Sequence, residues 1–378
     1  MRVLVLHNRY RVQGGEERAV ELHVDALRQA SVTHRELVRD SAETGRVRVA
    51  GAMLLGGDDP DEVARAARDL GATVVHAHNM QPLFGPRSLA AARDEGAKVV
   101  LHLHNFRLFC AIGVSFRLGK PCFRCHHGRT VPGLVLNCRD SLPEAAVYAA
   151  GLWRQYPQVL DVVDRFLAPS SHSVGQLVRL GVPAERIEAL PHYLPDEAIA
   201  SESRAHEGAF ALVSGRLSPE KGVEIAIEAA GLAGVPLRVA GDGPSAAELA
   251  AKARGASAPV EMLGRVPPSV LADLRRQAAV VLVPSRSDES FGLSALEAMG
   301  AGVPVIATCG GALTELVGAQ RCVPRDDTAA MADRLRELWL DPGLRRAEGD
   351  ELISRVREHY GRERFTRELL DLYSRVTA

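Results

Sequence analysis

The chain of 378 residues is poor in aromatic residues and in lysine, and it has almost no net charge. Aromatic residues make up 4% of it, and the formal net charge is -1. Lysine stands only at positions 98, 120, 221 and 252, which is typical of codon bias rather than of a function. A balanced charge by itself indicates no partner. No nucleic acid is expected, because neither a stacking module nor a nucleic-acid-binding fold is recognisable.

Long apolar runs are missing as well. No stretch approaches the roughly 20 apolar residues of a membrane-spanning helix. The first apolar run, Val3–Leu6, is followed at once by the polar residues His7, Asn8 and Arg9, whereas a secretory signal peptide has a longer apolar core. We therefore expect a cytoplasmic protein, with peripheral contact to the inner face of the membrane left open.

The pattern that is present favours an α/β fold with two domains. A chain of this length exceeds what one hydrophobic core usually supports. Short Val- and Leu-rich runs alternate with segments of helical period, which is typical of βαβ units on a parallel sheet. The predicted strands are Val3–Leu6, Thr73–His76, Lys98–Leu103, Ala209–Ser214, Leu237–Ala240, Val260–Leu263, Val280–Val283 and Val303–Ala307, and the predicted helices are Glu16–Gln29, Pro86–Glu95, Gly222–Ala233 and Ala246–Arg254.

A connection between the domains is predicted at residues 191–208, which mix proline, serine and charge without an apolar period. We place the first domain at residues 1–195, with a Cys-containing loop at 106–140, and the second at residues 196–355. The last segment, 356–378, has a helical period. It either closes the second domain or crosses back to the first.

The strongest functional motif follows the predicted strand Val280–Val283. Glu289 and Glu297 stand eight residues apart, which is about 12 Å along a helix, so they suit different parts of one long ligand. A helix that starts near Phe291 and Gly292 would direct its free backbone N–H groups at a diphosphate. Gly292 would let the phosphate approach the backbone, and Ser290, Phe291 and Leu293 belong to the same turn.

Two further loops end strands of the second domain. The first carries the cations Arg216 and Lys221 in the run SGRLSPEKG. An arginine can chelate phosphate oxygens and a lysine can add a mobile charge, so the pair could neutralise a leaving diphosphate. The second loop, with Gly241 and Asp242 in the run AGDGP, would shape a pocket for the base. A simple tight turn explains it equally well.

These three segments resemble the retaining family-4 glycosyltransferases of the GT-B fold, over nearly the whole chain. The resemblance implies two Rossmann-like domains facing across a cleft, the first binding the acceptor and the second the donor. It implies transfer of a hexosyl-type sugar from a nucleotide diphosphate, UDP or GDP, to a hydroxyl acceptor by front-face displacement, with no metal required. Arg216 and Lys221 would then bind the donor phosphates, Glu289 the sugar hydroxyls and Glu297 the ribose.

The first domain contributes candidates near its glycines. Gly14, Gly15 and Glu16 lie between the first strand and helix, but the G-x-G-x-x-G fingerprint of dinucleotide oxidoreductases is absent. In the resembling family the equivalent loop faces the donor diphosphate and the acceptor. Gly14 and Gly15 are therefore donor-side candidates and Glu16 an acceptor-side candidate, with a purely structural turn as the alternative.

Histidines end two neighbouring strands of this domain. His104 stands at the end of Lys98–Leu103, where the resemblance places a histidine beside the donor sugar, and we expect it to face the ligand. Asn105 follows it. His102, deeper in the strand, is expected to be a hydrogen-bonded core residue. His78 and Asn79, at the end of the preceding strand, are candidates for the acceptor side.

Four cysteines in the loop after His104 depart from a bare glycosyltransferase. Cys110, Cys122, Cys125 and Cys138 have a spacing that can make a tetrahedral zinc site. A disulfide or redox pair and unrelated thiols remain alternatives, and His126 and His127 are alternative ligands. Cys309 and Cys322, in the other domain, are expected to be ordinary packing residues.

The same loop is one-sidedly basic, since no Asp or Glu occurs from Gly96 through Arg139. It could attract an anionic acceptor, such as a phosphorylated sugar or lipid, or simply be solvated. Its phenylalanines could alternatively lean on a membrane; they are Phe106, Phe109, Phe116 and Phe123.

Two rival functions remain open at this point. A sugar-nucleotide epimerase or hydrolase would use the donor site without an acceptor, and a glycan-binding module would have a degenerate site. The intact set of Arg216, Lys221, Glu289 and Glu297 argues against the second.

Overall fold

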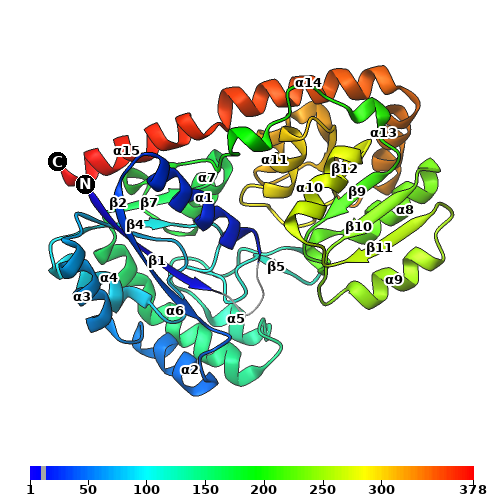
Figure 1. The fold of residues 1–378 in the computed structure, drawn as a ribbon. Coiled ribbons are helices and arrows are strands. Elements are labelled where there is room, and N and C mark those ends of the chain that lie inside the picture. Colours follow the sequence, from blue (N-terminus) through cyan, green and yellow to red (C-terminus); the bar gives the residue numbers. More distant parts are fainter. Residues whose placement is uncertain (10–13) are drawn as a thin grey trace. The chain divides into compact units, whose positions relative to one another are not determined.

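The structure is a computed structural model that describes residues 1–9 and 14–378. By their internal contacts these residues form two compact units. Unit 1 comprises residues 1–117, 122–192 and 365–378. Unit 2 comprises residues 118–121 and 193–364. Each unit is described by itself below (Figure 1).

Unit 1 is built on a parallel sheet of six strands in the order β2-β1-β3-β4-β7-β8. The strand order reverses at β1, which lies between β2 and β3. The elements, in chain order, are β1 (Arg2–Arg9), α1 (Gly15–Gln29), β2 (Thr33–Asp40), α2 (Arg46–Leu55), α3 (Pro60–Leu70), β3 (Val74–Ala77), α4 (Gly85–Asp94), β4 (Lys98–His102), β5 (Phe116–Arg117), α5 (Val131–Val135), α6 (Leu142–Val162), β7 (Arg165–Ala168), α7 (Ser171–Leu180), β8 (Ile187–Ala189) and, from Phe365 onward, α15 (Arg362–Thr377).

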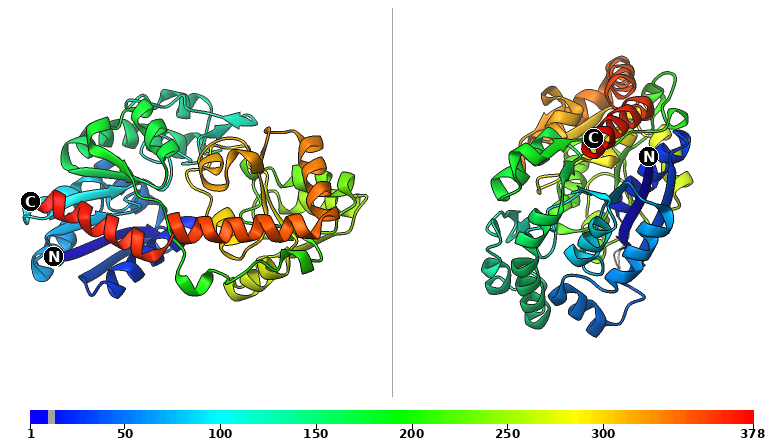
Figure 2. Two further views of the ribbon diagram at one scale, coloured as in Figure 1. Left: turned by 90° about the horizontal axis from the view of Figure 1, so that it is seen from above. Right: turned by 90° about the vertical axis from the view of Figure 1, so that its left-hand side faces the viewer.

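The two faces of this sheet differ in chemistry. Alternate residues of β1, β3 and β4 join α3, α4, α6 and α7 in one apolar core; those strand residues are Leu4, Leu6, Val75, Ala77, Val99 and Leu101. Because side chains alternate along a strand, His76 and His102 point to the opposite face. That face meets α1 and α15. The start of β1 and the end of α15, which are the two chain termini, lie near each other (Figures 1 and 2).

Unit 2 repeats the architecture with a parallel sheet in the order β11-β10-β9-β12-β13-β14. Numbered within the unit this is 3-2-1-4-5-6, the order of dinucleotide-binding Rossmann sheets. The elements are β6 (Lys120–Pro121), β9 (Ala211–Ser214), α8 (Val223–Ala233), β10 (Leu237–Ala240), α9 (Ala246–Arg254), β11 (Val260–Gly264), α10 (Pro268–Gln277), β12 (Val280–Val283), α11 (Leu293–Gly300), β13 (Val305–Thr308), α12 (Leu313–Val317), β14 (Cys322–Val323), α13 (Thr328–Leu340) and α14 (Pro342–His359).

Both faces of the second sheet bury apolar residues. One core joins Leu212 and Val281 to α11, α12 and α14, and the other joins Val213 and Val280 to α8, α9 and α13. The predicted α/β fold with two Rossmann-like units is thus confirmed. Every predicted strand and helix corresponds to an observed element, with ends shifted by a few residues.

The predicted connection at 191–208 is packed rather than free in its unit-2 part. The Leu194 amide donates to the Tyr360 carbonyl at 2.9 Å, and the Ala200 amide donates to the Gly300 carbonyl at 2.8 Å. The Ser203 hydroxyl also donates to the Gly302 carbonyl at 2.5 Å. Bonds of this kind satisfy backbone groups that a proline-rich segment cannot pair within itself. The final predicted helical segment, 356–378, contains the end of α14 and the whole of α15.

Candidate functional site

The loops after β9 and β12 form the first candidate site, in unit 2. These neighbouring strands flank the point where the strand order reverses, and open α/β sheets bind ligands outside the carboxyl ends of strands at such a point. The loop after β9 carries Arg216 and Lys221, and the loop after β12 carries Glu289. The fold therefore brings together three residues that the sequence analysis had chosen from separate motifs.

Lys221 and Glu289 form a direct ion pair between these loops. The Lys221 ammonium lies 2.6 Å from Oε1 of Glu289, and the same oxygen accepts a hydrogen bond from the Ser285 hydroxyl at 2.5 Å. Burial alone would raise the pKa of Glu289, but the Lys221 charge and these hydrogen bonds outweigh burial, so the pKa lies below its usual range. Glu289 is therefore a carboxylate at neutral pH, and Ser285 is a partner that the motif did not reveal.

Arg216 is held by a carboxylate of its own loop. Its guanidinium lies 2.6 Å from Oε1 of Glu220, which also accepts from the Ser218 hydroxyl at 2.7 Å. The Glu220 carbonyl in turn accepts from the amides of Arg286 and Ser287 at 2.9 and 3.2 Å. The side chain of Glu220, which is 9% exposed, thus holds Arg216, while its backbone carbonyl fastens the cationic loop to the loop after β12.

Helix α11 begins directly after these charged groups. Gly292 is its N-cap, with φ at +106°, and a β-carbon there would lie 2.7 Å from Leu313. The predicted start of the helix is confirmed within two residues, although Phe291 is buried against Tyr360 and offers only its backbone. Ser290 and Leu293 are half-buried in the same turn. Backbone amides at the start of a helix suit an anionic ligand.

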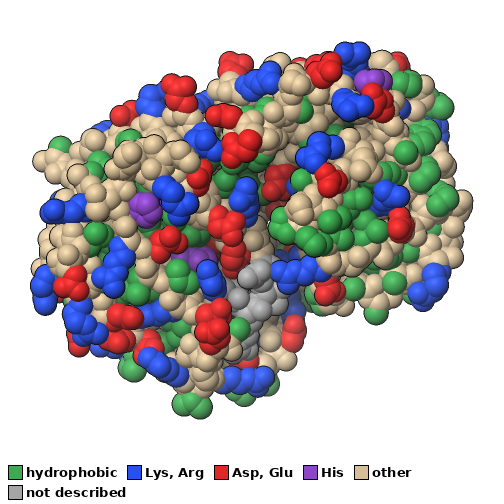
Figure 3. All heavy atoms as spheres, viewed as in Figure 1, with side chains coloured by type: hydrophobic (Ala, Val, Ile, Leu, Met, Phe, Trp, Pro, Cys, Tyr) green, Lys and Arg blue, Asp and Glu red, His purple; other side chains and the backbone are tan. Residues whose placement is uncertain are grey.

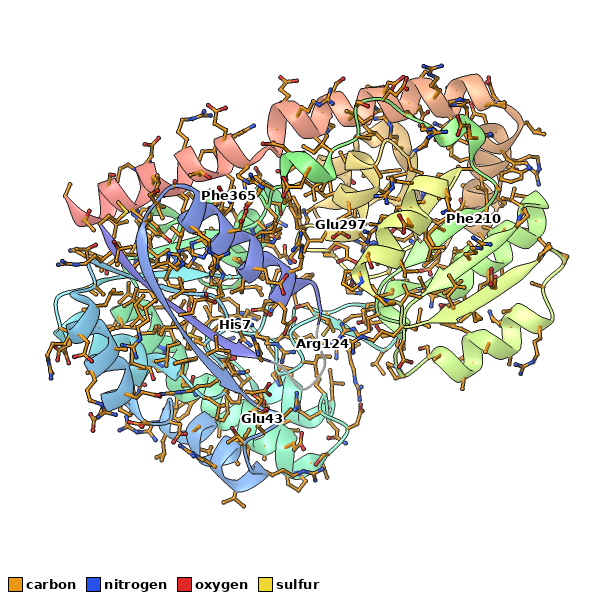
Figure 4. The ribbon with its side chains drawn as sticks, viewed as in Figure 1. His7, Glu43, Arg124, Phe210, Glu297 and Phe365 are labelled. Atoms are coloured by element: carbon orange, nitrogen blue, oxygen red, sulfur yellow. The ribbon has the colours of Figure 1, made fainter. Side chains whose placement is uncertain are left out.

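Glu297 has a partner that the sequence analysis missed. It lies on α11 (Figure 4) and pairs with Arg275 of α10. The side chain of Arg275 is 9% exposed and that of Glu297 is 25% exposed. Arg275 stands in an ordinary amphipathic helix, so its sequence context gave no signal of this pairing.

Gly241 has a packing role, in addition to any contact with a ligand. Its φ is +153°, and a β-carbon there would lie 1.8 Å from the Gly215 carbonyl oxygen. The Leu217 amide donates to the Asp242 carbonyl at 2.9 Å, and the Asp242 carboxylate accepts from the Gly243 amide at 2.7 Å. The turn thus supports the cationic loop, as the tight-turn alternative predicted, and its contact with a base stays a prediction.

A pocket in unit 1 is the second candidate site. It gathers every acceptor-side candidate together with His104; the lining residues are Glu16, His78, Asn79, Met80, Gln81, Leu101, Leu103, His104, Asn105, Arg107 and Leu108. Asn105 donates to Glu16 at 2.9 Å, and the Asn79 amide donates to the Asn8 carbonyl at 2.7 Å. Gly14 caps α1, and its amide donates to Glu17 at 2.7 Å. Gly15 is the first residue of α1.

The histidines of neighbouring strands form a continuous buried layer, and two of them, His78 and His104, line this pocket. His7 of β1 (Figure 4), His76 of β3 and His102 of β4 all lie on the sheet face opposite the apolar core. His102 and His104 stack with ring centroids 4.2 Å apart, and His192 stacks on His104 at 5.2 Å. The period-two patterns VHAH and LHLH predict this shared face once the strands are known to be neighbours.

A hydrogen-bonded chain runs through the layer to the C-terminal helix. The Tyr373 hydroxyl lies 2.9 Å from Nε2 of His23, and Nδ1 of His23 lies 2.6 Å from Nε2 of His78. Nδ1 of His78 lies 2.8 Å from Nε2 of His104. Tyr373 also lies 2.7 Å from Nδ1 of His76. Since a neutral imidazole has one donor and one acceptor nitrogen, the tautomer at one end of the chain determines the tautomers along it.

The spacing of these nitrogens suits shared protons better than a shared metal. His23, His76 and His78, and likewise His78, His102 and His104, have ring nitrogens within 4.8 Å of one another. Two nitrogens bound tetrahedrally to one zinc ion lie about 3.3 Å apart. The observed separations of 2.6 and 2.8 Å at His78 are shorter and fit hydrogen bonds.

Burial keeps this layer uncharged. It lowers the pKa of His23 and of His192 to about 3, and, with Arg9, the pKa of His7 to about 4. The remaining four members have a pKa well below the usual range because of burial and of one another; they are His76, His78, His102 and His104.

His102 corrects one expectation. It is buried as predicted, at 2% exposure. Neither of its ring nitrogens, however, has a hydrogen-bond partner among the described residues. A buried polar group without a partner costs stability.

The phenylalanines of the basic loop correct a second expectation. Phe106, Phe109 and Phe116 are buried, so these three rings cannot face a membrane, and the half-buried Phe123 packs on Phe106 with ring centroids 5.5 Å apart. No helix among the described residues is long and apolar enough to cross a membrane.

The charge of that loop is partly balanced in three dimensions. Arg117 pairs with Asp140 and Arg139 with Glu144, at 3.3 and 3.0 Å. Both acids stand just beyond the acid-free stretch of sequence. On the face visible in Figure 3, acidic and basic side chains are interspersed.

The two halves of the chain match two family models. Residues 15–196 match the model described as Glycosyltransferase Family 4, and residues 196–352 match the model described as Glycosyl transferases group 1.

Two curated relatives of this chain carry the same name. The D-inositol 3-phosphate glycosyltransferase of Acidothermus cellulolyticus is 30% identical over 286 residues, which span 68% of this chain and 62% of that protein. The protein of the same name from Kribbella flavida is 29% identical over 318 residues, 76% of this chain and 73% of that protein.

Solved structures with a similar fold cover the whole chain. Anabaena Alr3699/HepE in complex with UDP has a TM-score of 0.69 at 15% identity and covers 99% of this chain and 100% of its own. Sucrose-phosphate synthase of Thermosynechococcus elongatus has a TM-score of 0.74 at 17% identity, with 100% and 99% covered. Two Rossmann-like units matching these structures, with the two family models following each other along the sequence, show that this chain belongs to the family-4 glycosyltransferases of the GT-B fold.

Proposed function

We propose that this chain is a retaining glycosyltransferase that moves a hexosyl-type sugar from a nucleotide diphosphate to a hydroxyl acceptor, without a catalytic metal. The observation that carries the proposal is the Lys221–Glu289 pair at 2.6 Å, where the strand order of unit 2 reverses. A cation pre-placed by a carboxylate can move to a phosphate oxygen at little cost in side-chain entropy. The carboxylate of Glu289 is then free to accept hydrogen bonds from the sugar hydroxyls.

Charge stabilisation is the main task assigned to unit 2. Arg216, Lys221 and the amides at the start of α11 would stabilise the charge that develops on the leaving diphosphate, which replaces the role of a metal. In a front-face displacement the leaving diphosphate oxygen takes the proton of the acceptor hydroxyl. The role proposed for Glu289 is to orient the sugar, and the same role is proposed for His104.

UDP is the favoured donor nucleotide, with GDP as the alternative. Support comes from structural neighbours such as Alr3699/HepE, which is bound to UDP in its crystal structure. An acceptor that carries a phosphate fits the curated relatives, whose name gives inositol 3-phosphate. Arg107 in the lining of the unit-1 pocket is a suitable group for such an anion.

Ligand-induced stabilisation followed by turnover tests the proposal. UDP, GDP, ADP and dTDP are added to the purified protein, since a ligand at about 100 times its Kd stabilises by about 2.7 kcal/mol. Transfer from the selected sugar nucleotide is then measured with EDTA present, and NMR reads the anomeric configuration of the product. Inversion, or turnover that stops with EDTA and returns with Mg²⁺ or Mn²⁺ but not with Zn²⁺, would refute the corresponding part of the proposal.

Matched lysine variants separate charge at the site from charge in general. Lys221→Ala should lower kcat by about 100- to 1000-fold. Lys252→Ala removes another lysine of unit 2 that also pairs with a glutamate, Glu228, but lies far along the sequence from the site loops. It should leave kcat unchanged. Equal kcat values for the two variants would contradict the assigned role of Lys221.

A further inference from the structure

The loop between β4 and α6 holds four cysteines around one cavity of unit 1. The cavity, of about 20 Å³, is lined by Cys110, Cys122, Cys125 and Cys138. Two of the remaining lining residues are the cations Arg117 and Arg124, the second of which is labelled in Figure 4. Neither His126 nor His127 lines it, so these alternative ligands are not supported.

The four thiols come from three separate turns that the backbone fixes individually. The Cys110 amide donates to the Phe106 carbonyl at 2.7 Å, and the Cys122 amide donates to the Ser115 carbonyl at 2.7 Å. The Cys138 amide donates to the Gly133 carbonyl at 3.0 Å. Convergence of three independent turns on one cavity, each bringing cysteine, is not a requirement of packing.

This segment has little regular structure to hold it. Between β4 and α6 the only elements are the two-residue strands β5 and β6 and the five-residue helix α5. Ser115, His127 and Asn137 have positive φ values, of 47°, 49° and 42°. Such conformations cost energy and persist only where surrounding structure enforces them. A cross-link among the three turns would supply that enforcement.

We propose that Cys110, Cys122, Cys125 and Cys138 bind one structural zinc ion. Soft thiolates in a tetrahedral set of four are typical zinc ligands. The ion releases four protons on binding, and the resulting site carries a charge of -2, which Arg117 and Arg124 offset from the cavity lining. Two sulfurs bound to one zinc ion lie about 3.8 Å apart. In this structure no three of the four sulfurs lie within 4.8 Å of one another. The four side chains would therefore turn towards the cavity when zinc binds.

The structure gives no support to the disulfide alternative. All four cysteines are free thiols here. A bound cation favours their deprotonation directly.

The zinc would also set one wall of the unit-1 pocket. Cys110 lies in the turn whose Arg107 and Leu108 line that pocket. Its amide bond to Phe106 ties it to the same turn. Fixing Cys110 therefore fixes the position of Arg107.

Metal content of the full-length protein tests the proposal directly. Protein purified under reducing conditions without chelator should contain one zinc per chain by elemental analysis, and all six cysteines should react with a thiol reagent after denaturation. Replacement by Co²⁺ should give the ligand-field bands of a tetrahedral thiolate site. Absence of stoichiometric zinc, fewer than six reactive thiols, or bound iron would each overturn the proposal.

Cysteine variants locate the site. Cys125→Ser should reduce the zinc content to less than about a tenth per chain, because a missing ligand weakens binding strongly. Cys309→Ser, in unit 2, is the matched control and should retain one zinc per chain. If Cys125→Ser does not fold, the cobalt spectrum of the unaltered protein still decides, since it counts thiolate ligands without a variant. Equal zinc content in the two variants would refute the assignment.

Discussion

The histidine layer of unit 1 makes that unit sensitive to mild acid. Seven buried histidines have a pKa below that of an unfolded chain, about 6.5; they are His7, His23, His76, His78, His102, His104 and His192. A group whose folded pKa is depressed binds protons better when unfolded. Its stabilising contribution is complete above pH 6.5 and is lost as the pH falls towards the folded pKa.

The size of the effect follows from the unfolded pKa alone. Between about pH 7.5 and about pH 6, each such histidine loses just under 1 kcal/mol of stability. Seven together lose about 5 kcal/mol, which is comparable with the whole stability of many domains, about 5 to 15 kcal/mol. The side-chain charges acting on these rings come from Arg9 and from other histidines, so none of them offsets burial.

Urea denaturation at the two pH values measures this loss. Circular dichroism reports both units. In Trp153→Phe the remaining tryptophan, Trp339, reports unit 2, whose only histidines are His206 and His359, with side chains 33% and 38% exposed. Trp153 is 67% exposed, so its replacement should cost little. We expect the circular-dichroism midpoint to fall steeply at the lower pH.

A small effect of pH on the stability of unit 1 would refute the reasoning. If the free energy of unfolding of unit 1 changes by less than about 1 kcal/mol between the two pH values, the layer is not neutral in the folded state. If the urea midpoint read from Trp339 changes less between the two pH values than the midpoint read from circular dichroism, the loss of stability belongs to unit 1.

Three substitutions probe single contacts. Tyr373→Phe removes a buried hydroxyl that bridges two histidine nitrogens and should destabilise unit 1 by about 1 to 3 kcal/mol in urea denaturation. Tyr148→Phe, at a half-buried tyrosine, should cost less than Tyr373→Phe. His102→Leu replaces an unpartnered buried ring; it should raise the urea midpoint at neutral pH and remove one histidine's share of the acid sensitivity, and a lower midpoint would contradict this. Gly241→Ala would place a β-carbon 1.8 Å from a backbone oxygen and should lower the melting temperature, whereas Gly175→Ala, where an added β-carbon meets nothing within 4 Å, should leave it equal or higher.

Sequence alone predicted part of what local pattern determines. The strands and helices that were predicted, and the start of α11, follow from apolar period and glycine, so they could be placed within a few residues, whereas β2, α6 and α7 were not predicted. Partners far apart in the chain could not. Arg275 reaches Glu297 from another helix, and Tyr373 reaches His76 across 297 residues. A tyrosine in an amphipathic helix gives no sign that its hydroxyl will meet an imidazole.

The histidine layer is not a consequence of the fold. Unit 2 has the same parallel architecture, and both faces of its sheet bury aliphatic side chains such as Leu212 and Val213. In unit 1 one face is aliphatic, whereas the other carries imidazoles beside buried valines such as Val5 and Val100, and burial of these imidazoles costs stability that leucine or valine would contribute. Residues that break a packing rule at such a cost are expected near functional sites. Two members of the layer, His78 and His104, line the unit-1 pocket, and this supports a role for the layer in fixing how His104 presents its ring to a ligand.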